Sequence, residues 1–498
     1  MKTRTVIPCD IGASGGKVFL ASYDGERLAL EELHRFINKP ISVNGALYWD
    51  ILHIYDELQQ GLLKVRACGA SSIGIDSMSN DYVLLDKTGA LLELPHTYRD
   101  PRTLGMVERM EQYISAKELY RLTGLQFNRM NTLYQWLHMC CDRPEVLSVA
   151  KSALFLPDAL NYFFTGELRT EYTLASVSQA YAPQKKDWAY PLLNKIGFPA
   201  ELLQPIVPSG TKIGQLRQDS GLEALPVFAV GGHDTASAVA AVPSGAGRFA
   251  YISSGTWSIV GTECEHPLIN ARSFYHGLAN EGGVMDTIRL LKNVMGLWII
   301  QECRRCWAEQ GERYTYAELA ALAAQAPACG PVFDPDDECF YQPSDMPARI
   351  REYVASRGMR PPETVGEIAR CVFESLACKY RYVLESLEFA LGEKLPVIHI
   401  VGGGASNGIL NQLTASITKK PVYAGPVEAT ALGNALMQLV GLGELHSLGE
   451  ARELIARSFR LEEYWPDCDP CYEELYARFL NVTALKEAAP KELPKTFF

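Results

Sequence analysis

The sequence predicts an α/β protein built from two similar domains that face one another. Two parts of the chain begin in the same way, with a strand, a turn rich in glycine or hydroxyl groups and a second strand, at 5–23 and 248–262. Both parts end with a buried strand, consecutive glycines and a helix, at 227–242 and from 397 onward. Two units with the same order of elements indicate a duplicated α/β domain.

The composition is that of an ordinary globular chain, long enough for two or three domains. Of the 498 residues, 47% are hydrophobic and 21% are charged, and the net charge is −11. Such a chain has no overall attraction for nucleic acid or an anionic membrane, so an anionic ligand needs a local site. The sequence has no apolar run of about 18 residues and no signal-peptide core at its N-terminus. We therefore expect a cytoplasmic protein.

The 13 cysteines are odd in number and scattered. This is typical of reduced core thiols rather than of a disulfide framework. The CxxC pairs Cys303–Cys306 and Cys468–Cys471 are far apart in sequence, and the first lies in a helical pattern. We therefore expect neither zinc binding nor redox chemistry from them.

The first domain opens with strands at 5–9 and 17–23, joined by the turn Asp10-Ile-Gly-Ala-Ser-Gly-Gly16. The Asp24-Gly25 turn then leads into a third strand. The remaining elements expected in this domain are the strand at 27–36, a helix at 50–64, strands at 72–75 and 82–86, a mostly helical stretch at 101–181, a loop-rich connection at 199–226, a strand at 227–230 and a helix at 235–242.

The second domain follows a linker at 243–247. Its first two strands enclose the turn Ser254-Gly255-Thr256, and its last strand is followed by three glycines, Gly402 to Gly404. The elements expected here are strands at 248–253 and 257–262, an amphipathic helical pattern at 291–298, a strand at 397–401, a helix from 408, a helical tail at 450–486 and a loosely ordered end at 488–498.

The first candidate site is the glycine-rich turn after Asp10. Its backbone N–H groups and the Ser14 hydroxyl could bind an oxyanion such as phosphate, and Asp10 at the strand end could hold Mg²⁺. The turn is not a Walker A loop, because it joins two strands, Ile11 stands six residues before Lys17, and Val18 follows that lysine. An ordinary hairpin with a capping aspartate remains the alternative.

Two further turns could bind phosphate. The turn at Thr256 offers N–H and O–H donors, and the glycines at 402–404 allow a ligand to approach the backbone closely. These glycines do not complete a dinucleotide-binding fingerprint, because Asn407 occupies the last glycine position. For each turn, a purely structural role is the alternative.

Asp234 is the fourth candidate, because it follows Gly231-Gly232 at the start of a helix, where N–H groups are unpaired. A carboxylate there either acts as a general base on a hydroxyl or caps the helix. We interpret His233 as an orienting group, since no second histidine or cysteine stands at metal-binding spacing. Arg99 and Asn293 could reach into a cleft, although a structural or solvated role is the default.

Several long stretches together resemble the FGGY family of carbohydrate kinases, from about Asp10 to about Leu439, and most closely its rhamnulokinase branch. The stretches that carry the resemblance are Asp10-Ile-Gly-Ala-Ser-Gly-Gly-Lys17, Gly74-Ile-Asp-Ser77, Tyr98-Arg-Asp-Pro-Arg-Thr103, His233-Asp-Thr-Ala-Ser-Ala-Val239, Ser253-Ser-Gly-Thr-Trp-Ser258, Asn280-Glu-Gly-Gly283, Leu291-Lys-Asn-Val-Met-Gly-Leu-Trp298 and Gly425-Pro-Val-Glu-Ala-Thr-Ala-Leu-Gly-Asn434.

The resemblance implies two ribonuclease H-like domains of the actin-like ATPase type, with ATP and sugar in the cleft between them. It implies a sugar-binding domain with the base at 1–243, an ATP-binding domain at 244–445 and a helical tail at 446–498. The reaction it implies is ATP- and Mg²⁺-dependent phosphorylation of a ketose, with L-rhamnulose favoured, at its 1-hydroxyl. We expect a monomer or homodimer with no nucleic-acid or membrane partner.

The resemblance also implies roles for individual residues, with Asp234 as the catalytic base and Asp10 as the metal ligand. Together with Arg99, the residues expected to bind the sugar are Ser79, His233, Asp234, Thr235 and Asn293. The residues expected to contact ATP are Ala13, Ser14, Gly15, Gly16, Lys17, Thr256, Gln301, Gly402 and Gly403.

One departure from the rhamnulokinase pattern concerns the sugar. After Gly-Ile-Asp these kinases usually carry Thr-Trp-Gly-Val-Asp, whereas this chain has Ser77-Met78-Ser79-Asn80-Asp81. The altered pocket wall leaves open a kinase for another deoxy-ketose or a ketopentose, such as L-fuculose or xylulose. A non-catalytic nucleotide-binding protein is an alternative of another class, against which the presence of both Asp10 and Asp234 argues.

Overall fold

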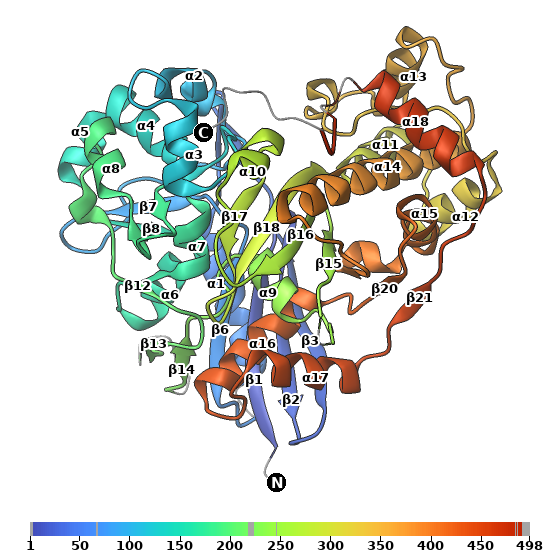
Figure 1. The fold of residues 1–498 in the computed structure, drawn as a ribbon. Coiled ribbons are helices and arrows are strands. Elements are labelled where there is room, and N and C mark those ends of the chain that lie inside the picture. Colours follow the sequence, from blue (N-terminus) through green and yellow to red (C-terminus); the bar gives the residue numbers. More distant parts are fainter. Residues whose placement is uncertain are drawn as a thin grey trace.

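A mixed β-sheet in the first half of the chain forms the first of two frameworks in this computed structural model (Figure 1). The structure describes residues 3–65, 68–217, 224–245, 247–483, 485 and 487–490. The sheet order is β13-β14-β6-β1-β2-β3, with β2 antiparallel to β1, and with β6 parallel to both β1 and β14. Its strands are β1 (Arg4–Ile11), β2 (Gly15–Tyr23), β3 (Leu28–Ile37), β6 (Ser72–Ser77), β13 (Lys212–Gln215) and β14 (Pro226–Phe228).

The second half of the chain builds a sheet with the same central order, β17-β18-β16-β15-β19-β20-β21. Its first two strands form an antiparallel hairpin, and β19 and β20 follow in parallel beside β15. The run β3-β2-β1-β6-β14 of the first sheet therefore matches the run β18-β16-β15-β19-β20 of the second, with two antiparallel pairings followed by two parallel ones, which confirms the predicted duplication. The strands are β15 (Ala250–Ser254), β16 (Trp257–Cys264), β17 (Ala279–Gly282), β18 (Ile288–Met295), β19 (Ile398–Val401), β20 (Val422–Ala424) and β21 (Glu462–Tyr464).

Helices cover both sheets and bury apolar side chains against them. In α1 (Ile51–Lys64) the buried side chains Ile51, Ile54, Leu58 and Leu62 recur every three or four residues. The long α14 (Val365–Leu391) begins at a capping box formed by Thr364 and Glu367. The other helices of the second half are α10 (Ala271–His276), α11 (Trp298–Glu309), α12 (Tyr316–Gln325), α13 (Met346–Ser356) and α15 (Gly408–Thr418), with short 3₁₀ turns at Glu338–Phe340 and Gly403–Ser406.

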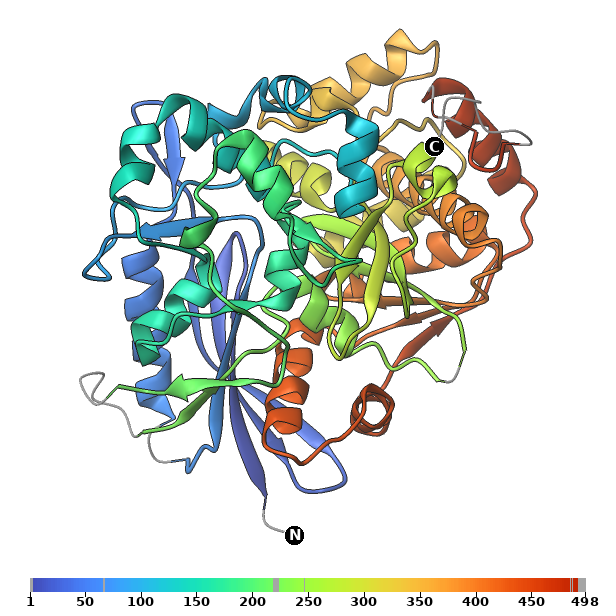
Figure 2. The same cartoon turned by 60° about the vertical axis from the view of Figure 1, so that its left-hand side comes forward.

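A largely helical segment is inserted between β6 and β13, where the sequence predicts helices. Figure 2 shows it in cyan and green beside the first sheet. Its core is aromatic, with the rings of Trp136 and Phe198 stacked at 4.3 Å. Its helices are α2 (Met106–Met110), α3 (Ala116–Thr123), α4 (Thr132–Asp142), α5 (Pro144–Val149), α6 (Leu156–Thr165), α7 (Tyr172–Val177) and α8 (Tyr190–Ile196), with 3₁₀ turns at Pro101–Thr103 and Ala200–Leu202.

Short ribbons of paired strands complete the first half. The predicted strand at 82–86 pairs with β8 in such a ribbon rather than with the main sheet. The ribbons are β4 (Ile41–Val43) with β5 (Ala46–Tyr48), β7 (Tyr82–Leu85) with β8 (Ser152–Phe155), β9 (Thr170–Glu171) with β12 (Ile206–Val207), and β10 (Tyr181–Ala182) with β11 (Asp187–Trp188).

Two helices cross between the halves at the centre of the molecule (Figure 1). Helix α9 (Asp234–Ala240) packs against α16 (Ala429–Gly441), and α16 lies on β1 and β6 of the first sheet. Asn434 donates to the Asp76 carboxylate at 2.5 Å, and Gln438 donates to the Ile7 carbonyl at 3.1 Å. Buried hydrogen bonds thus join α16 of the second half to β1 and β6 of the first half.

Two predicted helical stretches are wrong. Residues 291–298 are not helical throughout, because most of them belong to β18, which pairs with both β16 and β17. A short apolar run that is buried on both faces looks the same in a helix and in a strand. The tail at 450–486 is divided into α17 (Leu448–Ser458), the edge strand β21 and α18 (Cys471–Val482). Of the predicted loose end, residues 491–498 lie outside the described part.

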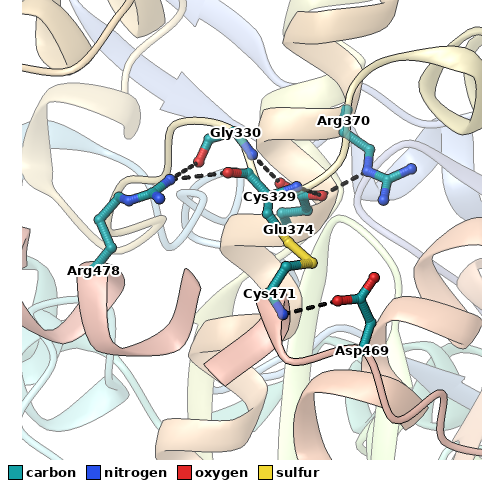
Figure 3. The surroundings of a disulfide bond; sticks show 7 residues. All are labelled: Cys329, Gly330, Arg370, Glu374, Asp469, Cys471 and Arg478. Atoms are coloured by element: carbon teal, nitrogen blue, oxygen red, sulfur yellow. Dashed lines mark hydrogen bonds and ion pairs between the residues drawn. A yellow bond between two sulfur atoms is a disulfide. The ribbon is translucent and has the colours of Figure 1, made fainter. Parts of the chain in front are cut away.

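The favoured interpretation of the cysteines as reduced thiols does not hold for one pair, because Cys329 and Cys471 form a disulfide (Figure 3). The two residues are 142 positions apart, so no local spacing could indicate the pair. Glu374 accepts from the N–H groups of Cys329 and Gly330, while Arg478 donates to their carbonyls. These contacts fasten α18 to the loop before α13.

Two further features bear on the predicted class of protein. Within the described residues, no helix is long and apolar enough to cross a membrane. The same residues contain no group of three or more histidine, cysteine or acidic side chains arranged to hold a metal ion. The predicted absence of zinc at the CxxC pairs stays a prediction.

Candidate active site

A cleft of about 420 Å³ opens between the two halves and is lined by both. The β1–β2 turn of the first sheet and the β15–β16 turn of the second contribute to the same cleft. The start of α9 and the glycines after β19 complete its centre, and the helical insertion forms one end. The duplicated order of strands is the reason for this arrangement, because it brings equivalent turns to face each other.

The β1–β2 turn is closed by a hydrogen bond from the Gly12 N–H to the Gly15 carbonyl, at 2.9 Å. A Cβ at Gly15 would lie 2.8 Å from the Phe36 carbonyl, so glycine is required for the approach of β3. Gly16 packs against the Phe36 ring and does not line the cleft. The other predicted nucleotide contacts of this turn, Ala13, Ser14, Gly15 and Lys17, line the cleft.

Lys17 makes an ion pair across the cleft. Its Nζ lies 2.7 Å from both carboxylate oxygens of Glu428, which stands just before α16. The pair is partly exposed, with 23% of the lysine side chain and 32% of the glutamate side chain accessible. A phosphate that binds Lys17 therefore has to compete with this carboxylate.

The β15–β16 turn packs on the glycines that follow β19. A Cβ at Gly404 would lie 2.0 Å from the Ser254 hydroxyl, and Gly402 has a φ of +83°. Thr256, Gly402 and Gly403 line the cleft, and their contact with nucleotide stays a prediction. Gln301 does not line it and instead accepts a hydrogen bond from the Thr256 hydroxyl, at 3.4 Å.

Three carboxylates lie near one another beneath the cleft. Burial, and then the charge of Asp234, raise the pKa of Asp10. Burial, and then the charge of Asp10, raise the pKa of Asp76, whose Oδ1 has no hydrogen-bond partner among the described residues. Because these three carboxylates repel one another in a medium of low dielectric constant, a bound cation would stabilise their ionised forms.

Asp234 is the first residue of α9, and the N-cap is His233, which makes no capping hydrogen bond with its side chain. Asp234 is therefore not the helix cap that the sequence left open. Its Oδ1 accepts from the Thr235 N–H at 2.6 Å and from the Thr235 hydroxyl at 3.1 Å. Among the described residues, no donor is directed at Oδ2. Burial raises the pKa of Asp234 to about 6, against the hydrogen bonds from Thr235.

The predicted sugar-binding residues are only partly together. Ser79, His233, Thr235 and Asn293 line the cleft beside Asp234. Arg99 does not, because its guanidinium lies over the ring of Trp298, 4.7 Å from the ring centroid. In this structure Arg99 therefore does not line the cleft, and its role in sugar binding stays a prediction, as do those of the other four residues.

The altered wall at Met78-Ser79-Asn80 faces the cleft. Asn80 has a φ of +76°, and its carbonyl accepts from the Thr132 hydroxyl and from the Gln135 amide. The wall is thus held by α4 of the helical insertion. Sequence reasoning missed three polar residues of the helical insertion that line the cleft and that no motif marks: Gln126, Asn128 and Asn131. Glu281, which lies in the stretch Asn280-Glu-Gly-Gly283, also lines the cleft and had no predicted role.

Comparison with known proteins agrees with this architecture. The models of the N-terminal and C-terminal domains of the FGGY family of carbohydrate kinases match residues 5–241 and 250–442. A rhamnulokinase from Bacteroides thetaiotaomicron is 43% identical over 478 residues, which is 95% of this chain and 98% of the relative. A rhamnulokinase from Pectobacterium atrosepticum is 38% identical over the full length of both chains.

Solved structures are similar in fold at much lower identity. A gluconate kinase from Lactobacillus acidophilus superimposes with a TM-score of 0.77 at 18% identity, over 97% of this chain and 98% of its own. A xylulose kinase from Rhodospirillum rubrum gives a TM-score of 0.77 at 19% identity, with the same coverage. At such identities the likeness concerns the fold alone.

Proposed function

Because the chain belongs to the FGGY family of carbohydrate kinases, we propose that it transfers the γ-phosphoryl group of ATP to the 1-hydroxyl of L-rhamnulose. The enzyme is a sugar kinase with ATP as its co-substrate, as the family implies. The choice of sugar is supported by the rhamnulokinases that match nearly the whole chain. The observation that carries the chemistry is Asp234, which lies in a cleft between the two candidate phosphate-binding turns and has one carboxylate oxygen that no donor of the described residues reaches.

The proposed chemistry needs a base on the sugar side. As the bond from the sugar oxygen to phosphorus forms, Asp234 accepts the hydroxyl proton at Oδ2. A pKa of about 6 keeps this carboxylate ionised at neutral pH while leaving it more basic than an exposed aspartate. His233, Thr235, Ser79 and Asn293 would orient the sugar, and alignment is the main source of rate for a loose phosphoryl-transfer transition state.

The nucleotide is assigned to the two facing turns. Ala13, Ser14 and Gly15 supply backbone and hydroxyl donors from the first half, and Thr256, Gly402 and Gly403 form the opposite wall. In this assignment residues 1–243 bind the sugar and carry the base, residues 244–445 bind ATP, and residues 446–498 form the tail. Lys17 would leave Glu428 to contact phosphate.

Asp10 is the proposed protein ligand for Mg²⁺. The unpartnered Asp76 Oδ1 and the raised pKa of Asp10 fit an added positive charge at this place. Mg²⁺ is commonly bound by one or two carboxylates and by substrate phosphates, so a larger protein cage is not required. When bound, the ion would neutralise charge on the phosphate oxygens.

A second sugar remains a candidate because of one specific observation. Met78, Ser79 and Asn80 form the wall where these kinases usually carry an aromatic residue and a glycine. A panel of ketoses, including L-rhamnulose, L-fuculose and xylulose, can be compared by ADP release. L-rhamnulose should give the highest kcat/KM. A higher value for another ketose would replace the proposed substrate while leaving the kinase chemistry intact.

The base assignment is tested by Asp234→Asn, which keeps the size of the side chain and removes its basicity. Turnover should fall by about 10²- to 10⁴-fold, the usual range for a lost general base. Asp286→Asn is the matched control, because Asp286 is exposed and its ion pair with Lys186, at 3.8 Å, is exposed as well. The control should keep full activity. An Asp234→Asn enzyme that retains more than a tenth of the turnover would show that another group accepts the proton.

A further inference from the structure

Arg289 is a fully buried residue of β18 that contacts the segment carrying Asp234. Its Nε donates to the Gly282 carbonyl at 2.9 Å, and its Nη2 donates to Nδ1 of His233 at 3.1 Å. Glu281 Oε2 lies 3.1 Å from the same Nη2. This carboxylate oxygen receives no aligned hydrogen bond from the described residues, so the N–H of Nη2 is directed at the histidine ring.

The contact determines which ring nitrogen of His233 carries the proton. A guanidinium has only donors, so Nδ1 must be the acceptor and the single N–H of the neutral ring must be on Nε2. A proton on Nδ1 would point into the Arg289 N–H, which excludes both the other tautomer and the imidazolium. Burial, and then the charge of Arg289, hold the pKa of His233 well below its usual value, which agrees with a neutral ring.

Nε2, which carries the ring proton, is the nitrogen of His233 that lies nearer to Asp234. Nε2 lies 3.4 Å from Asp234 Oδ1, the same oxygen that accepts both hydrogen bonds from Thr235. The two donors of Thr235 hold Oδ1 by hydrogen bonds, and the His233 Nε2–H group adds a polar contact at 3.4 Å that is not an aligned hydrogen bond. Among the described residues, no donor is directed at Oδ2, which is left for the ligand. The only lone pair of the His233 ring faces Arg289, so His233 cannot accept a proton from the sugar.

We propose that Arg289 is a positioning residue, which holds His233 as the Nε2–H tautomer. The proton-bearing nitrogen, and not a lone pair, then lies beside Asp234 Oδ1, and Oδ2 is kept for the sugar hydroxyl. The inference rests on the proposed role of Asp234 as base. Arg289 and Glu281 come from the second sheet, whereas His233 and Asp234 come from the first half of the chain. The surroundings of the base therefore depend on contact between the two halves.

The tautomer can be measured without any assay of activity. Long-range ¹H–¹⁵N spectra of the full chain labelled in its nine histidines report which nitrogen of each ring is protonated. The difference spectrum of His233→Gln assigns the signal of His233. At pH 7.5 this signal should show the Nε2–H tautomer. An Nδ1–H tautomer or an imidazolium in the wild-type protein would overturn the proposal.

Variants test whether Arg289 is the cause. In Arg289→Gln, kcat/KM for the ketose should fall by about 10- to 100-fold, the usual cost of losing an outer partner. The acidic limb of its pH profile should move upward, because the charge of Arg289 lowers the pKa of Asp234. The charged or titratable groups that face His233 are Asp234, Glu281 and Arg289. Arg289→Lys should recover part of the activity and return the acidic limb of the pH profile to its wild-type position.

The matched control is Arg370→Gln, which breaks a buried arginine–glutamate pair with Glu374 on α14, away from the cleft. It should lower the melting temperature and leave both the tautomer and the acidic limb unchanged. If Arg289→Gln keeps both the His233 tautomer and the acidic limb of the wild-type pH profile, the proposal is refuted. If this variant does not fold, the spectrum of the wild-type protein decides. A wild-type protein with the expected tautomer but no ketose kinase activity would instead refute the proposed function.

Discussion

Gly433→Ala should lower both stability and turnover, because α16 touches α9 through this glycine. A Cβ at position 433 would lie 1.8 Å from the Ser237 carbonyl oxygen and 2.5 Å from its carbon. Real Cβ atoms essentially never approach closer than 3.0 Å, so the helices must separate by about 1.2 Å. The atoms in the way belong to the Ser237 backbone, so no change of side-chain rotamer can relieve the clash.

Two costs follow from this separation. Overpacking of a buried contact costs about 1–3 kcal/mol of unfolding free energy. Ser237 stands one turn after Asp234 on the seven-residue α9, so the base moves with the helix. A misplacement of about 1 Å can reduce turnover by roughly 100-fold. Gly433→Ala should therefore melt at a lower temperature and turn over at least tenfold more slowly.

Gly449→Ala is the matched control for the change in helix propensity. Gly449 is exposed on α17, and a Cβ there would meet only the Ser447 hydroxyl, at 3.9 Å. Alanine should stabilise this helix by about 0.5–1 kcal/mol and leave turnover unchanged. Melting curves and coupled ADP-release assays measure both variants. If the Gly433→Ala enzyme is as stable and as active as wild type, α9 and α16 can separate at little cost in free energy, and the reasoning is refuted.

Three further predictions concern pH, nucleotide binding and the disulfide. At saturating Mg²⁺ and ATP, kcat/KM for the sugar should fall about tenfold per pH unit below pH 6, since Asp234 has a pKa of about 6 and must be ionised; a flat profile from pH 7 to 5 would contradict this. Glu428→Gln should lower KM for ATP by about two- to fivefold, because Lys17 loses its competing partner in a partly exposed pair; an unchanged or higher KM would exclude such competition. Cys471→Ser should lower the melting temperature without affecting kcat, because it removes a cross-link worth about 2–4 kcal/mol. A reductant should lower the melting temperature of the wild-type protein to that of the variant and leave the variant unchanged.

The parts of the fold that could be predicted from the sequence depend on local turn chemistry. The turns after Asp10 and around Thr256 contain residues that a tight strand connection demands, so both hairpins were expected where they occur. Asp234 was placed correctly at the start of a helix because Gly231 and Gly232 interrupt the preceding strand. The resemblance to sugar kinases then connected these separate turns into one cleft.

Other features could not be predicted because they depend on residues far apart in the chain. The disulfide joins Cys329 to Cys471, and Arg99 lies against Trp298 instead of the cleft. The apolar run of β18 shows no period that distinguishes a doubly buried strand from a helix. Gln126 and Asn128 line the cleft through tertiary packing alone.

The position of α16 on the first sheet has a consequence for biosynthesis. Gln438 of α16 bonds to the Ile7 carbonyl of β1, and the two residues are 431 positions apart in the chain. During translation, β1 and β6 leave the ribosome long before the helix that covers them has been made. The domain synthesised first is therefore completed last, and its apolar sheet face has to be protected from aggregation while the rest of the chain is produced.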